Sequence, residues 1–149
     1  MPDPARPTAG YARYRTEVRQ EWIDYNGHLT DAAYAVVLSE ANEMLLAALG
    51  LSEDYRAGTG CAMYTAECHI RYLAESKLGD VLQAVSILAA ADAKRLRVYT
   101  SLSRGDGTTV VTGEHLYLHV DVAAGRVTAI PADRWTGVAA LLSAHASLE

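Results

Sequence analysis

The stretch Trp22-Ile23-Asp24-Tyr25-Asn26-Gly27-His28-Leu29-Thr30-Asp31 leads into the segment that decides the fold. Beyond it, apolar or small residues recur at steps of three and four, at Tyr34, Val37, Leu38, Ala41, Leu45, Ala48 and Leu49. This spacing predicts an amphipathic helix over residues 31–49 with one broad buried face. Thr30 suits the N-cap, Asp31 suits the positive end of the helix dipole, and Gly50 suits the left-handed position after the last turn.

The polar loop that precedes this helix is where we expect the chemistry. Asp24, Asn26 and His28 stand close together and feed into a helix N-terminus, where free backbone N–H groups favour anions. A carboxylate beside a carbonyl carbon can activate water or attack directly, while N–H donors stabilise the oxyanion of the tetrahedral state. A purely structural role for Asp24, as a cap or an ion-pair partner, stays open.

The other loop residues also allow two interpretations. Asn26 could hold a carbonyl or orient water, or it could simply serve the turn. Gly27 has no Cβ, so it allows a substrate to approach the backbone closely. The helix dipole disfavours the charged form of His28, and a neutral imidazole could donate to substrate or hold Asp24 in place.

The rest of the chain reads as an antiparallel meander, because apolar alternation is interrupted by turn signals. A first edge strand is predicted around residues 14–18. Further strands are predicted over 61–74, 81–90, 96–102, 108–122 and 127–130, and a terminal helix over 132–146.

Two connections carry specific expectations. Residues 51–60 hold two glycines and several charges, and we expect a mobile connection that could act as a flap. Asp106-Gly107 predicts a hairpin with a primed turn, in which both central residues have positive φ angles.

The strand over 61–74 carries two groups of candidate residues. Thr65, Glu67, His69 and Arg71 are predicted to share one face, so that Glu67 and His69 could line a cleft. The two cysteines, Cys61 and Cys68, lack metal-ligand spacing and are expected to be buried free thiols.

The strand histidines carry no metal motif. We interpret His69, His115 and His119 as satisfied surface or interface residues rather than metal ligands, and no metal site is expected.

One long helix and an antiparallel meander predict an α+β domain in which the sheet wraps around the helix, as in the hotdog fold. We expect five to six strands, with a short C-terminal helix. Residues 11–149 form this single domain, and residues 1–10, which hold three of the four prolines, form a disordered tail. The uncovered outer face and edge strand of the sheet predict self-association.

Composition argues against several classes of function. The net charge of −5 disfavours a partner such as nucleic acid or an anionic membrane. No run of about 18 apolar residues is present, and the first residues lack the hydrophobic core of a secretory signal. We therefore expect a cytoplasmic protein. Nine Tyr, two Trp and no Phe fit either interface tyrosines or a cage for a cationic ligand.

The run from Glu21 to Leu29 resembles the signature of hotdog-fold acyl-CoA thioesterases of the 4-hydroxybenzoyl-CoA thioesterase superfamily. In that superfamily the catalytic carboxylate is an Asp three residues before a Gly, at the start of the long helix. Asp24 and Gly27 occupy those places here, and Tyr34 matches a tyrosine of the first helical turns.

Later stretches, over 67–73, 92–96 and 118–121, look most like the betainyl-CoA thioesterases of carnitine degradation. One departure concerns Leu29 and Thr30, which stand where that subgroup is expected to carry Met-Asn.

The resemblance implies hydrolysis of a small acyl-CoA thioester, with betainyl-CoA as a candidate. Asp24 would act as general base or nucleophile, and Asn26 and His28 would position the thioester. The expected substrate-binding residues are Trp22, Tyr25, Gly27, Leu29, Thr30, Tyr64, Glu67 and His69.

Among these, Trp22, Tyr25 and Tyr64 are the candidates for a cation cage. The resemblance implies no cofactor beyond the coenzyme A of the substrate. It also implies a homodimer or tetramer with each site at a subunit boundary.

Two other functions stay open at this stage. The chain could bind an acyl-CoA without turnover, or it could dehydrate a hydroxyacyl thioester with His28 and Glu67 as the catalytic pair. Dehydration releases no free thiol, so the products separate these functions from hydrolysis.

Overall fold

The computed structural model describes residues 12–146, so the predicted tail over residues 1–10 lies outside the described residues. Ten elements follow one another along the chain. They are β1 (Ala12–Glu17), a 3-10 turn (Gln20–Trp22), α1 (Asp31–Ala48), α2 (Glu53–Thr59), β2 (Cys61–Tyr72), β3 (Val81–Ala91), β4 (Arg95–Arg104), β5 (Thr109–Asp121), β6 (Arg126–Val127) and α3 (Ala132–His145).

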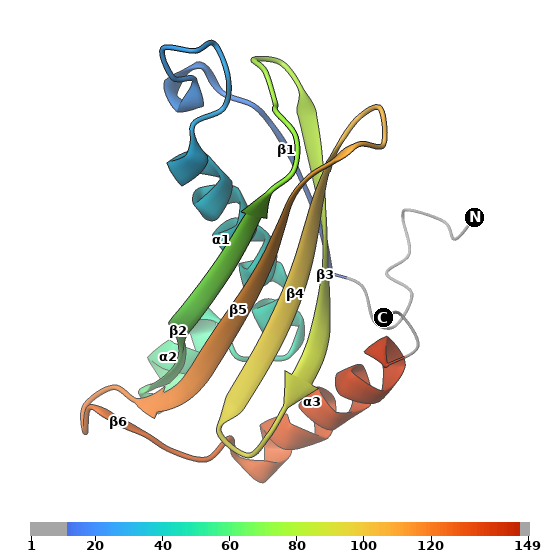
Figure 1. Ribbon diagram of the computed structural model, residues 1–149. Coiled ribbons are helices and arrows are strands. Elements are labelled where there is room, and N and C mark those ends of the chain that lie inside the picture. Colours follow the sequence, from blue (N-terminus) through green and yellow to red (C-terminus); the bar gives the residue numbers. More distant parts are fainter. Residues whose placement is uncertain (1–11, 147–149) are drawn as a thin grey trace.

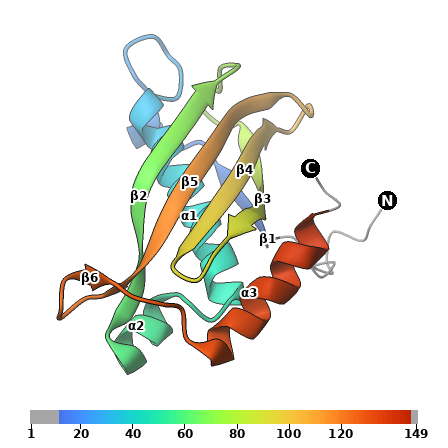
Figure 2. The ribbon, with the colours of Figure 1, turned by 60° about the horizontal axis from the view of Figure 1, so that its bottom comes forward.

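The strands form one antiparallel sheet in the order β1-β3-β4-β5-β2. The short strand β6 pairs with β5 beyond Arg95, the first residue of β4. Figure 1 shows the sheet curving past α1, and Figure 2 shows α3 running beside β3. Arg134 of α3 donates to the carbonyl of Gly50 at 2.9 Å, so α3 packs next to the C-terminal end of α1. The predicted hotdog arrangement, a long helix held by a curled antiparallel sheet, is confirmed.

The predicted helix is confirmed almost to the residue, and it ends as its sequence indicates. Leu51 donates its N–H to the carbonyl of Leu46 at 2.9 Å, and Gly50 has a φ of +70°. This is the left-handed ending that glycine favours. At the other end, Thr30 occupies the N-cap, but its hydroxyl makes no capping bond to the helix backbone.

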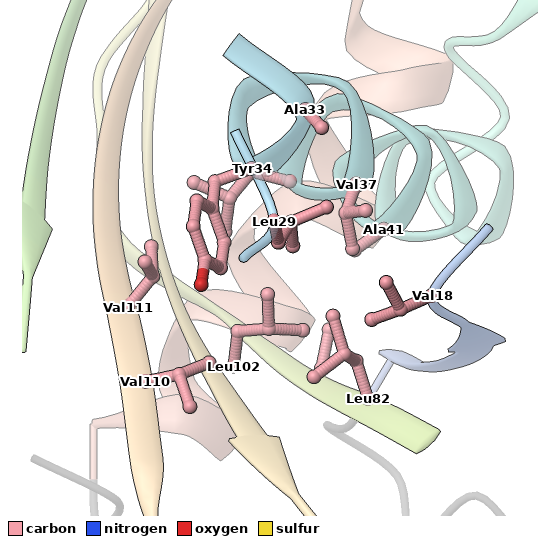
Figure 3. Close-up of a cluster of buried hydrophobic side chains, with 12 residues drawn as sticks. Val18, Leu29, Ala33, Tyr34, Val37, Ala41, Leu82, Leu102, Val110 and Val111 are labelled. Carbon is pink, nitrogen blue, oxygen red and sulfur yellow. The ribbon is translucent and has the colours of Figure 1, made fainter. Parts of the chain in front are cut away.

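The apolar face of α1 forms one side of the core. Ala33, Tyr34, Val37 and Ala41 point toward the sheet (Figure 3). They meet Leu82, Leu102, Val110 and Val111 from the strands. Leu45 and Leu46 lead into a second cluster that α3 closes with Val138.

One polar residue interrupts this apolar face. Asn42 is fully buried, and its amide nitrogen donates to the Tyr117 hydroxyl at 3.0 Å. Its amide oxygen accepts from Thr100 at 2.6 Å and from Ser86 at 3.3 Å. A single side chain therefore ties α1 to β3, β4 and β5.

Two of the predicted connections are wrong in detail. Residues 53–59 form the helix α2 rather than a loose flap, because Tyr55 is buried in the second core cluster and anchors the segment. The hairpin at Asp106-Gly107 is present, but only Gly107 has a positive φ, so the turn is not primed. Asp106 instead accepts the N–H of Thr108 at 2.9 Å.

The face assignment on β2 also needs correction. A β-bulge interrupts the pairing with β5 between Thr65 and Glu67, so that Thr65 opposes Tyr117 and Cys68 opposes His115. The extra residue reverses the alternation, which places Thr65 on the face of Cys68 and opposite to that of Glu67.

The predicted burial of the cysteines and of two histidines is wrong. Both thiols are free, but Cys61 is half-buried and Cys68 is exposed. His115 and His119 are buried rather than at the surface. His119 is satisfied by the Tyr55 hydroxyl at 2.7 Å and the Thr128 carbonyl at 3.0 Å.

Within residues 12–146, no single helix is both long and apolar enough to cross a membrane. The one combination of that length and composition joins α1 and α2, which are bent by 57° relative to each other.

A buried histidine joins α3 to the sheet. Strand β1 pairs with β3 as far as Ser86, and just beyond it the N–H of Leu88 donates to Nδ1 of His145 at 2.6 Å. Burial lowers the pKa of His145, so the neutral ring that accepts this bond is favoured.

Replacing Asn42 with Ala is expected to lower the free energy of unfolding by about 1–3 kcal/mol, because buried hydroxyls lose their partner. Urea unfolding measures the change. Ser39→Ala, at an exposed position of the same helix, is the control and should stay close to wild type. Equal stability of the two variants would contradict this role for Asn42.

The stability of the fold should also depend on His145. The pKa of His145 in the folded protein lies below the ordinary value of 6.5. The contribution of His145 to the free energy of unfolding is therefore complete above pH 6.5, and it is lost as the pH falls through the folded pKa. His145→Asn keeps a hydrogen-bond acceptor but has no ionisable group. We expect this variant to lose less free energy of unfolding on acidification, by at most about 1.4 kcal/mol per pH unit. Thermal unfolding from neutral to mildly acidic pH measures this loss. An unchanged acid dependence in the variant would contradict the role of this ring.

Candidate active site

The loop between the 3-10 turn and α1 is closed by its own backbone. Ile23 and Leu29 form an isolated antiparallel bridge, and the N–H of Asp24 donates to the carbonyl of His28 at 2.9 Å. Gly27 turns the chain with a φ of +77° and donates to the carbonyl of Asp24 at 3.0 Å. The polar residues of this stretch are therefore held in a defined turn.

The Asp24 carboxylate is fixed by two N–H groups of this turn. Its Oδ1 accepts from Asn26 at 2.8 Å and from His28 at 3.4 Å. Within residues 12–146, its other oxygen, Oδ2, makes no hydrogen bond. One carboxylate oxygen is thus used for positioning and the second is available to a ligand.

The turn is fastened to the rest of the fold from two sides. The N–H of Leu29 donates to the carbonyl of Ser76 at 2.9 Å, which joins the loop to the turn between β2 and β3. Next to this bond, Nε2 of His28 lies 3.1 Å from a carboxylate oxygen of Glu75. Arg104 holds the carbonyl of Glu75 at 2.6 Å, so strand β4 also supports the site.

These elements surround a shallow pocket of about 270 Å³ at the start of α1. Asp24, His28, Leu29, Asp31, Tyr34, Tyr72, Ala74 and Glu75 line it. Its lining brings together three carboxylates, one imidazole and two tyrosines. No lysine or arginine belongs to it.

The free N–H groups expected at the helix start are mostly occupied. Ala32 donates to the side chain of Asp31 at 2.9 Å, and Ala33 donates to the carbonyl of Thr30 at 3.1 Å. Thr30 donates to the carbonyl of Trp22 at 2.8 Å. Among the described residues, the N–H of Asp31 is the first-turn donor that remains for a ligand.

The structure brings only part of the predicted site together. Asp24, His28 and Leu29 line the pocket, whereas Asn26 and Tyr25 are exposed on the turn. Gly27, Thr30 and Trp22 belong to the same loop, but Trp22 packs against the core and below the guanidinium of Arg19.

Three other predicted residues do not line this pocket within a single chain. Glu67 and His69 are exposed on the face of β2 opposite to that of Tyr72, because the side chains alternate without interruption from Glu67 to Tyr72. Tyr64 is eight residues before Tyr72 along β2, roughly 26 Å at the usual rise of a strand. Their role in substrate binding stays a prediction.

Sequence reasoning missed four lining residues, which are Asp31, Tyr72, Ala74 and Glu75, and it connected Tyr34 with the site only through the resemblance. The signal was weak, because Tyr72 and Glu75 stand at the end of a predicted strand. Nothing in the local pattern says that this strand end returns to the start of α1. Within residues 12–146, no cluster of three His, Cys, Asp or Glu residues could hold a metal ion.

Known proteins are similar to this chain over most of its length. The family model of the thioesterase-like superfamily matches residues 18–142. An L-carnitine dehydrogenase/betainyl-CoA thioesterase of Agrobacterium fabrum is 47% identical over 118 residues, which are 79% of this chain but only 24% of that protein. A betainyl-CoA thioesterase of Pseudomonas aeruginosa is 37% identical over 136 residues, 91% of this chain and 86% of that protein.

Among solved structures, a Staphylococcus aureus protein in complex with CoA superimposes with a TM-score of 0.85 at 29% identity. The match covers 89% of this chain and 84% of that one.

The turn that holds Asp24 should depend on the conformation of Gly27. A Cβ at this position would meet nothing within 4 Å, but a φ of +77° is strained for any side chain. We therefore expect Gly27→Ala to lower the free energy of unfolding by about 1–2 kcal/mol. Gly58→Ala, in the helix α2 and equally open, is the control and should be neutral or stabilising. Chemical denaturation compares the two, and equal effects would contradict strain as the cause.

Proposed function

Because the chain belongs to the thioesterase-like superfamily, we propose that it hydrolyses the thioester of a small acyl-CoA, with betainyl-CoA as the first candidate substrate. The observation that carries this proposal is the Asp24 carboxylate. It is fixed through one oxygen, lines a pocket at the N-terminus of α1 and keeps its second oxygen free within the described chain.

The carboxylate can act by either of two routes. As a general base, Asp24 takes a proton from water while the water oxygen bonds to the carbonyl carbon. As a nucleophile, its own oxygen forms that bond, and the resulting mixed anhydride is then hydrolysed by water. In both routes the C–S bond breaks, CoA leaves as the thiolate and is protonated, and the acyl group departs as a carboxylate.

The neighbouring groups support the charge that develops. The N–H of Asp31, which has no partner among the described residues, would donate to the carbonyl oxygen as it becomes an oxyanion, and a donor of this kind is commonly worth about 2.7–4 kcal/mol. His28, beside Glu75, forms the wall of the pocket next to Asp24 and can orient the thioester. Asn26 supplies the N–H that fixes Asp24.

The proposal includes an oligomer, a homodimer or a tetramer. Strand β2 is an edge of the sheet, and its exposed Tyr64 and Tyr72 accompany exposed Val36 and Met44 on α1. A second copy would cover Tyr64, Val36 and Met44 and border the pocket, in which Tyr72 stays open to the substrate. The proposal requires no cofactor beyond the coenzyme A of the substrate, and it retains the cytoplasmic location predicted from the sequence.

Thiol release from betainyl-, acetyl-, medium-chain and aromatic CoA esters tests the function. We expect Asp24→Asn to lower kcat by about 100- to 10,000-fold on every ester that the wild type hydrolyses. Asp54→Asn, on the exposed start of α2, is the control and should stay close to wild type. Single-turnover hydrolysis in ¹⁸O-labelled water tests the nucleophilic route. When water opens the anhydride at the Asp24 carbonyl, the product carries an unlabelled oxygen from Asp24 and the label enters Asp24, whereas the general-base route always puts the label into the product.

Other outcomes would support the alternatives. Binding of these esters by the folded protein without thiol release would indicate a binding protein. Formation of an unsaturated thioester from a hydroxyacyl-CoA without thiol release would indicate a dehydratase.

A further inference from the structure

Two aromatic rings meet at the pocket beside Asp24. Tyr34, from the first turn of α1, and Tyr72, from the last residue of β2, have ring centroids 5.8 Å apart and planes inclined by 67°. Tyr34 is 4% exposed and Tyr72 is 53% exposed. A fixed inner ring and an accessible outer ring thus stand nearly perpendicular, as two walls of one corner.

The charge at this corner is negative. Of the three lining carboxylates, Glu75 has a partner in His28, whereas Asp31 forms no ion pair within residues 12–146. Asp31 is exposed and lies next to Tyr72, whose hydroxyl donates to the Asp31 backbone carbonyl at 3.5 Å. Burial and the negative charge of Asp31 raise the pKa of Tyr72, which reflects the same local field.

The pair of aromatic rings and the carboxylate of Asp31 would both stabilise a cationic group in this pocket. Aromatic faces attract quaternary ammonium groups, and carboxylates without cationic partners add a longer-range attraction. In a betainyl thioester the ammonium nitrogen is two bonds from the carbonyl carbon. The pocket that receives the reacting carbonyl must therefore also receive the cation, and the pocket beside Asp24 contains the rings and the charge.

We propose that Tyr72 and Asp31 select a cationic acyl group at this pocket, with Tyr34 as its inner wall. This inference rests on the proposed thioesterase function and specifies the residues that determine its substrate. The proposed cation site at Tyr72, Asp31 and Tyr34 replaces the cage of Trp22, Tyr25 and Tyr64 that we expected from the sequence. On one chain, Tyr25 is 98% exposed on the turn, and Tyr64 lies far along β2 from Asp24.

The test compares betainyl-CoA with 3,3-dimethylbutanoyl-CoA, in which a carbon atom replaces the ammonium nitrogen and the shape is kept. The ratio of the two kcat/KM values isolates the effect of the charge. We expect the wild type to prefer the cationic ester, and Tyr72→Leu to reduce this preference by about 2- to 30-fold, the range of a cation–π contact. Tyr72→Phe, which keeps the ring, should retain most of it.

Asp31→Asn tests the electrostatic part of the proposal. It keeps an acceptor for the N–H of Ala32, so the helix start is preserved. The preference should fall, and its dependence on ionic strength should weaken, because a screened charge has been removed. Asp54→Asn and Tyr99→Leu, which lie outside the pocket, are the matched controls and should leave the ratio at its wild-type value.

The outcomes distinguish a failure of this inference from a failure of the proposed function. Hydrolysis of both esters without a preference for the cation, or a preference that survives both Tyr72→Leu and Asp31→Asn, would overturn the inference and leave the thioesterase intact. A loss confined to Tyr64→Leu would restore the cage expected from the sequence and also overturn it. Absence of thiol release from every ester would overturn the proposed function itself.

Discussion

The amide of Asn42 is the interaction on which the arrangement of this fold depends. It lies in an otherwise apolar helix face and reaches Tyr117, Thr100 and Ser86, one residue from each of three strands. Apolar contacts alone tolerate sliding of a helix along a sheet, because they have no direction. A buried amide does not, since a shift by one residue would leave its donors and acceptors without partners at a cost of about 1–3 kcal/mol for each.

The position of α1 decides what meets at its N-terminus. With the helix fixed against β3, β4 and β5, its first turn lies beside the end of β2 and the turn that follows. The Leu29 bond to Ser76 and the His28 contact with Glu75 form across this junction. Asp24 is therefore held between two parts of the chain that are about fifty residues apart in the sequence, and the geometry of the pocket follows from the packing of the core.

The electrostatics of the pocket follow from the same junction. The loop contributes Asp24, the first helical residue contributes Asp31, and the turn after β2 contributes Glu75. Each carboxylate alone is ordinary for a loop or a helix start. Brought together without a lysine or an arginine among the lining residues, they favour a cationic over an anionic ligand. A nearby pair of aromatic rings gives this preference a specific shape.

The sequence by itself determined the long helix with its glycine ending, the antiparallel meander and the polar turn around Asp24, because these depend on periodicity and on turn chemistry within a few residues. It misjudged the β2 faces, the α2 segment and the turn at Asp106-Gly107, where one bulged residue, one buried tyrosine and one side-chain bond override the local pattern. Only the tertiary structure decided that Tyr72 and Glu75 join Asp24 at one pocket. The physical reason is that residues distant in the chain become neighbours through the curl of the sheet and the fixed position of the helix, and neither is encoded in any short stretch of sequence.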